Sequence, residues 1–130
     1  LDLPVIWHSG RASVGPKDSW KYSAMKGYIE PLKSFPKMRF IFGHSGNRDW
    51  KEALEIAADN KNVWCDTHGL GIPAMEEFLD RLGPERLFFG SDWPFYHIAA
   101  SMAKALHVTR GDQKVRTLLL RDNAENFLNG

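Results

Sequence analysis

The sequence predicts an α/β fold in which parallel βα units form about half of an eight-stranded (β/α)8 barrel, the TIM barrel. Four apolar runs end in polar residues at positions 8, 44, 68 and 92, which are 36, 24 and 24 residues apart by subtraction. Segments with helical spacing of apolar residues separate these runs, as in a parallel sheet covered by helices. The chain has 130 residues, whereas a full barrel needs about 250. Four units therefore make about half of one.

Each strand is predicted from a short, nearly continuous apolar run that is followed by turn-forming residues. The fourth run is the clearest, because Leu87–Phe89 is apolar and aromatic whereas Pro94 cannot donate to a sheet ladder. An open doubly wound sheet is the alternative, but no Gly-x-Gly-x-x-Gly motif follows any strand. We expect parallel strands near residues 3–8, 38–44, 62–67 and 86–91.

The segments between the strands carry helix signals, and residues 11–29 predict a long loop over a site, in which a helical turn could form. Proline favours the first turn of a helix, an acidic residue can cap it, and glycine commonly follows its end. The signals in chain order are Pro31 before Phe35-Pro36, Asp49 to Asn60, Pro73 to Gly83, the spacing of Ile98, Met102 and Leu106, and Asp122 with Glu125.

The composition is that of one soluble globular domain, which we assign to residues 1–130. Seventeen basic and sixteen acidic residues give a formal net charge of +1, and no basic and aromatic stripe predicts a nucleic-acid partner. No apolar run approaches the ~20 residues of a membrane span, so no membrane association is expected. The single cysteine, Cys65, fits a reducing compartment. We therefore expect a cytoplasmic location.

Polar side chains at successive strand ends predict a functional site. Parallel barrels carry catalytic residues at the carboxyl ends of their strands, and Asp92 is the first candidate there. Imidazole and carboxylate are ligands for a zinc-like ion, which acidifies bound water. Taken singly, each histidine is more often a hydrogen-bonded loop residue, and Asp92 could simply cap the following helix. Alternation along the strands groups Ile6 with His8, Phe40 and Phe42 with His44, and Phe88 with Asp92, on an inner barrel face.

Two further histidines are substrate-side candidates. His68 ends the third run, but Asp66 shares its face and could be its partner. His97 lies close to the predicted site in the sequence and is otherwise a helix or loop residue. Cys65 and His68 are three residues apart and so on opposite faces of a strand, which argues against a shared metal.

Five blocks in sequence order resemble the C-terminal half of the amidohydrolase 2 family of metal-dependent TIM-barrel hydrolases and decarboxylases. They are LPVIWHSG, FPKMRFIFGHSG, NVWCDTHG, GPERLFFGSDWP and DNAENFL. The resemblance implies that the chain supplies strands five to eight and the terminal helices. It also implies that His8 binds the metal, that Asp92 binds it and handles protons, and that His44 acts on substrate or metal-bound water. The His-x-His pair of the family's first strand has no counterpart in this sequence.

The resemblance implies that the full-length parent is a hydrolase or nonoxidative decarboxylase. Its substrate would be a small carboxylated cyclic or amide-like molecule, and its cofactor zinc or a similar divalent ion. The alternative is a non-catalytic half-barrel or interaction module that lacks the His-x-His ligands. Because four parallel units leave sheet edges and an apolar face open, we expect a homo-oligomer or association with another half-barrel.

Overall fold

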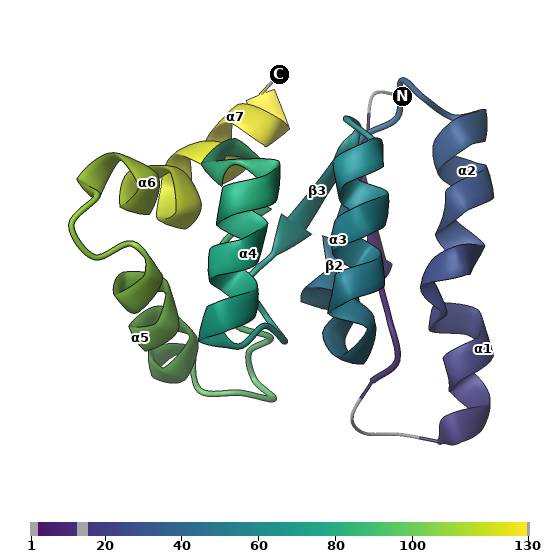
Figure 1. The fold of residues 1–130 in the computed structure, drawn as a ribbon, viewed down its shortest axis with the longest axis horizontal. Helices are drawn as coiled ribbons and strands as arrows, with labels where there is room; N and C mark the ends of the chain where they lie inside the picture. The colour runs from purple at the N-terminus through teal and green to yellow at the C-terminus, as the bar shows by residue number, and fades with distance from the viewer. Residues whose placement is uncertain (1–2, 13–15, 130) are drawn as a thin grey trace.

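In the computed structural model, which describes residues 3–12 and 16–129, four strands form one parallel sheet (Figure 1). The strands are β1 (Val5–His8), β2 (Phe40–Gly43), β3 (Val63–Asp66) and β4 (Leu87–Phe88). They pair in chain order, and all three pairings are parallel. This arrangement confirms the predicted α/β class and parallel topology.

The fourth strand is shorter than the predicted range of 86–91. The backbone amide of Phe89 donates to the carbonyl of Leu119, at 2.9 Å, instead of continuing the ladder with β3. The sequence contains no signal for this exchange, because the acceptor lies thirty residues further along the chain by subtraction.

Helices cover one face of the sheet. In Figure 1, α3 (Trp50–Asp59) and α4 (Ile72–Leu82) run side by side in front of the strands, close to their predicted ranges. The other helical segments are η1 (Lys17–Ser19), α1 (Trp20–Ser23), η2 (Met25–Tyr28), α2 (Ile29–Ser34), η3 (His44–Asp49), η4 (Pro84–Arg86), α5 (Ile98–Val108), α6 (Gln113–Thr117), the π-helical turn η5 (Leu118–Asp122) and α7 (Asn123–Asn129). The predicted loop over residues 11–29 is thus partly helical.

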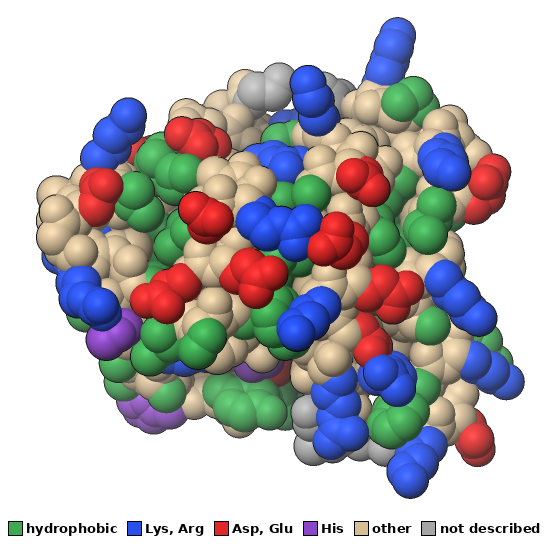
Figure 2. Space-filling model, viewed as in Figure 1, with side chains coloured by type: hydrophobic (Ala, Val, Ile, Leu, Met, Phe, Trp, Pro, Cys, Tyr) green, Lys and Arg blue, Asp and Glu red, His purple; other side chains and the backbone are tan. Residues whose placement is uncertain are grey.

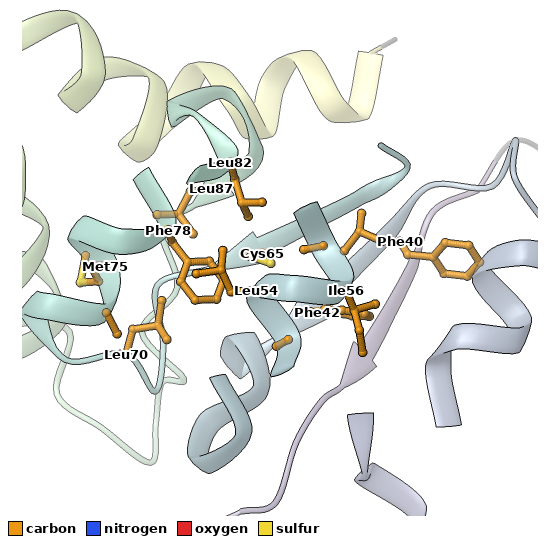
Figure 3. Packing of buried hydrophobic residues seen from close by; sticks show 14 of the residues in the cluster. Phe40, Phe42, Leu54, Ile56, Cys65, Leu70, Met75, Phe78, Leu82 and Leu87 are labelled. Atoms are coloured by element: carbon orange, nitrogen blue, oxygen red, sulfur yellow. The ribbon is translucent and has the colours of Figure 1, made fainter. Parts of the chain in front are cut away.

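The hydrophobic core fills the space between the sheet and these helices (Figure 3). Phe40 and Phe42 of β2 are buried there, with Leu54 of α3 and Phe78 of α4 also in the core. Their prediction as residues of the open inner face is therefore wrong. Within β2 the side chains do alternate, but the alternation places Ile41 on the open face, opposite Ile6 of β1.

The opposite face of the sheet, which would line a complete barrel, is only partly covered. Ile6 is 70% exposed there, whereas Phe88 is buried. Phe127 of α7 packs on this face, with its ring centroid 5.1 Å from that of Phe88 and 4.8 Å from that of Trp64. A cavity of about 290 Å³ lies on this face between the strands and α7.

The apolar stripe predicted for the helix after β4 does not form its buried side. Ser101 and Ala105 are the buried residues of α5, whereas Ile98 and Leu106 are 47% and 41% exposed. Small side chains therefore face the body of the protein. Asp112 caps the next helix, α6, by accepting from the amide of Val115.

The surface over α3 and α4 carries both signs of charge (Figure 2). Arg81 of α4, for example, pairs with Glu55 of α3 at 2.7 Å. In the described part of the chain, no helix has both the length and the apolar character needed to cross a bilayer.

Candidate metal centre

Three histidines and an aspartate lie at the carboxyl edge of the sheet, where the sequence predicts a site. His8 ends β1, His44 follows β2, His68 follows β3 and Asp92 follows β4. The rings of His8 and His44 have centroids 4.4 Å apart, and those of His44 and His68 are 4.8 Å apart. His44 thus stands between the other two imidazoles, as the strand order requires.

The donor atoms of His44, His68 and Asp92 converge. One ligand atom from each lies within 4.8 Å of the others, and Nε2 of His68 is 3.3 Å from Oδ2 of Asp92. Two imidazoles and a carboxylate match the ligand types that divalent zinc accepts. His8 borders this cluster through its contact with His44 and is exposed.

His44 reaches the cluster through an unusual backbone conformation and not through strand alternation. Its φ is 66°, and Ser45, Gly46 and Asn47 also have positive φ values. Positive φ is uncommon for residues other than glycine and asparagine, and it persists where surrounding contacts hold the chain. This turn carries His44 toward the site, whereas Phe42 points into the core.

Ser9 holds this turn from the neighbouring strand. Its side chain is fully buried, and its hydroxyl donates to the carbonyl of Gly43 at 2.7 Å and accepts from the amide of Gly46 at 3.0 Å. Gly10 lies so close to the turn that a β-carbon on it would come within 1.8 Å of the carbonyl oxygen of Gly46. The turn after β2 is therefore fixed against the end of β1.

Asp66 positions two of the histidines through their backbones. Its carboxylate accepts the amide of His44 at 3.1 Å and that of His68 at 3.0 Å. Burial raises the pKa of Asp66 to about 7, and these two hydrogen bonds oppose the rise. Asp66 was predicted as a possible partner of His68, and it does bind that residue, but at the main chain. The ring of His68 faces Asp92 instead.

The environment favours neutral imidazoles. Burial lowers the pKa of His44, and repulsion from His8 and His68 adds to the effect. Burial also lowers the pKa of His68, against the opposing influence of Asp92. Neutral imidazole is the form that binds metal.

His44 also has a buried polar atom that is unexplained by the protein alone. Its Nδ1 has no hydrogen-bond partner within the described residues. Buried polar groups are almost always satisfied. An unpartnered nitrogen in a cluster of ligand atoms fits a divalent ion, and the residues present are therefore suited to hold one.

The cluster opens into a cavity of about 460 Å³, large enough for a small molecule. Residues beyond the predicted set line this cavity, and they are Ala12, Asn47, Phe95 and Tyr96. Phe95 is 82% exposed, and the ring of Tyr96 lies 4.9 Å from that of His68. The sequence signal for these two aromatic residues is their position directly after the Asp92-Trp93-Pro94 turn.

His97 lies at the start of a helix, in agreement with its interpretation as a helix or loop residue, whereas Asp92 does not take the capping role considered for it. His97 caps α5, because its Nδ1 accepts from the amide of Ala99 at 3.2 Å. Asp92 does not cap that helix and instead presents its carboxylate, 30% exposed, to His68. Cys65 is buried on the helix-covered face, away from the cluster.

Comparison of the sequence with protein-family models shows which family the chain belongs to. The amidohydrolase family model matches residues 1–130. The chain belongs to the amidohydrolase family.

Relatives of this chain include an uncharacterized protein, y4mH, of Sinorhizobium fredii, which is 26% identical over 82% of this chain and 44% of its own length. An L-fucono-1,5-lactonase of Burkholderia multivorans is 27% identical over 75% of this chain and 31% of its own length. The chain thus spans less than half the length of these curated relatives.

Solved structures show the same fold. A TIM-barrel protein of Bordetella bronchiseptica superimposes with a TM-score of 0.76 at 19% identity, over 98% of this chain and 46% of that protein. The 5-carboxyvanillate decarboxylase of Sphingomonas paucimobilis gives a TM-score of 0.72 at 15% identity, over 98% of this chain and 50% of that enzyme. A dihydroxybenzoic acid decarboxylase of Polaromonas, solved with bound manganese, gives a TM-score of 0.71 at 16% identity, over 98% of this chain and 50% of that enzyme. The fold of this chain therefore corresponds to about half of a barrel.

Proposed function

We propose that the strand ends of this amidohydrolase bind a divalent ion, zinc or a similar metal. The protein to which the chain belongs would use the ion in hydrolysis or nonoxidative decarboxylation of a small carboxylated cyclic or amide-like substrate. The observation that carries the proposal is the convergence of ligand atoms from His44, His68 and Asp92 within 4.8 Å. The lactonase and the decarboxylases among the similar proteins support both reaction types.

Each residue at the strand ends would have its own role in metal binding or catalysis. His44, His68 and Asp92 would hold the ion, and His8, which contacts the ring of His44, would be a further ligand. When bound, such an ion supplies a Lewis acid that polarises a substrate oxygen and acidifies water. Asp92 is partly exposed, so its carboxylate could also exchange a proton with a substrate in the cavity. Where His8 is the ligand, His44 is free to polarise the reacting group.

Metal titration of single variants tests the proposal and separates the two ligand sets. We expect Asp92→Asn to weaken zinc binding by at least roughly tenfold, because a removed ligand leaves too few donors for a typical zinc site. His68→Gln and His8→Gln identify which imidazole joins Asp92. His107→Gln, at an exposed histidine of α5, is the control. Zinc binding that is unchanged in Asp92→Asn would contradict the proposal.

Turnover is measured on the full-length parent with 2,6-dihydroxybenzoate and a sugar 1,5-lactone, which represent the two reaction types. Loss of activity in Asp92→Asn is expected with whichever substrate is accepted. Undiminished activity in that variant would rule out the assigned role of Asp92.

The second candidate function is a non-catalytic half-barrel that serves as an interaction module. The apolar lining of the open sheet face, which includes Ile6, Ile41 and Leu128, supports it, since exposed apolar surfaces often mark interfaces. A chain that associates but binds neither zinc nor manganese would favour this candidate.

A further inference from the structure

A second cavity, of about 260 Å³, adjoins the candidate metal centre. Asn47, His68 and Tyr96 line both cavities. The side cavity continues past His68 between the loop after β3 and α5, where Leu70 and Lys104 line it. A ligand at the metal centre could therefore extend along the His68 ring into this space.

Lys104 is the charged residue that lines the side cavity. Its other lining residues are Asn47, His68, Gly69, Leu70, Tyr96, Ala100 and Ser101, none of which is acidic. The Nζ of Lys104 donates to the carbonyl of Leu70 at 2.8 Å. An ammonium group has three donors, and this bond fixes one of them while it holds the group at the wall of the cavity.

The position of Lys104 also differs from that of a solvated surface lysine. Lys104 is partly buried, and burial lowers its pKa. Its charge acts on His68, whose pKa it helps to lower. A partly desolvated cation with unfilled donors binds an anion more strongly than an exposed one, because solvent screens it less.

We propose that Lys104 forms a carboxylate-binding subsite beside the metal centre, and that the substrate carries an anionic group at the end remote from its reacting bond. This inference rests on the proposed function, since it places the reacting bond at His44, His68 and Asp92. It narrows the substrate class to molecules that carry a carboxylate on the side that extends past His68 toward α5. Ser101, buried in the same wall, and Tyr96 add hydroxyl groups near that carboxylate.

The test uses the metal-free 130-residue chain, so that its readout is independent of metal and turnover. The chain is titrated with glutarate and with glutaramide, a neutral molecule of similar shape, while the backbone amide signals of Leu70, Ala100 and Ser101 are followed by NMR. We expect glutarate to shift these signals in a saturable way and to bind more tightly than glutaramide.

Variants then assign the effect to the Lys104 charge. Lys104→Met should weaken glutarate binding roughly tenfold or more, the usual size of one charge-assisted hydrogen bond, and should leave glutaramide binding unchanged. Lys104→Arg should retain the preference for glutarate. Lys114→Met, at an exposed lysine of α6, is the matched control and should behave as the unchanged chain.

Equal glutarate affinity in Lys104→Met and the unchanged chain would overturn the inference. Equal weakening of glutarate and glutaramide binding in Lys104→Met would also overturn it, because that result would indicate a structural role for the Lys104–Leu70 hydrogen bond. A failure of the proposed function looks different. In that case zinc binding is absent or independent of Asp92, while glutarate binding still depends on Lys104.

Discussion

Replacement of Ser9 by alanine should destabilise the fold and loosen the metal centre together. The Ser9 hydroxyl is fully buried and links β1 to the turn that carries His44. In Ser9→Ala the carbonyl of Gly43 keeps its bond from the Ser9 backbone amide, at 3.0 Å. The amide of Gly46 loses the hydroxyl that it donates to and is left buried.

The magnitude follows from these contacts. A buried donor without a partner costs about 1–3 kcal/mol, and this range already includes the hydrogen bond that is lost with the hydroxyl. We therefore expect the free energy of unfolding to fall by about 2 kcal/mol. With a urea dependence of about 1–3 kcal/mol/M, the unfolding midpoint should move down by roughly 1 M.

The turn that Ser9 holds contains four residues with positive φ, which makes His44 sensitive to its release. Loss of a group that hydrogen-bonds a metal ligand directly weakens metal affinity about 10–100-fold, and because Ser9 acts only on the turn that carries His44, we expect the lower end of this range. Urea denaturation and zinc titration of Ser9→Ala measure the two effects. Ser34→Ala, at an exposed serine of α2, is the control and should stay within about 0.5 kcal/mol. A Ser9→Ala chain with unchanged stability and zinc affinity would refute the reasoning.

Three further predictions concern the core, the rim of the site and the open face. Phe78→Ala should lower the free energy of unfolding by about 3–5 kcal/mol in urea, because it empties a fully buried site; a loss below about 1 kcal/mol would contradict the packing. Hydrogen bonds from Arg11 lower the pKa of Asp49 in the folded chain. Ionised Asp49 therefore stabilises the fold at pH values above its unfolded pKa, near 3.8. This stabilisation is lost as the pH falls through the lower pKa of the folded state. Asp49→Asn should therefore flatten the pH dependence of the free energy of unfolding below about pH 4. An unchanged pH dependence would exclude a stabilising Arg11–Asp49 ion pair. Sedimentation should show self-association that Ile6→Glu reduces, because Ile6 is 70% exposed on the open sheet face; a monomer at all concentrations would argue against this interface.

The strand topology could be predicted because its signals are local. Each strand is a short apolar run, and the helices between the runs leave only parallel pairing within one sheet. The inner face was predicted less well, because alternation was extended from Phe42 through the strand end to His44. The left-handed turn at His44, with φ of 66°, breaks that alternation.

The residues that position the site could not be predicted from the sequence. Ser9 and Asp66 each follow or end a strand, but their roles depend on hydrogen bonds to residues 37 and 22 positions away. Lys104 has no motif at all, and only the packing of α5 against the loop after β3 brings it to Leu70. His97 was predicted as a substrate-side candidate or a helix or loop residue, and its ring caps α5.

The hydrogen bonds that position His44, His68 and Asp92 connect successive strand ends of this chain. Ser9 connects the ends of β1 and β2, and Asp66 connects the segments after β2 and β3. Thr67 connects β3 to the exit of β4, because its hydroxyl accepts the amide of Gly90 at 3.0 Å. These three contacts do not involve the open face of the sheet, where Ile6 lies exposed. Metal binding and substrate enclosure should accordingly be separable. We expect the four strand ends to set the positions of His44, His68 and Asp92, and a surface packed over the open sheet face at Ile6 to affect substrate enclosure more than metal affinity.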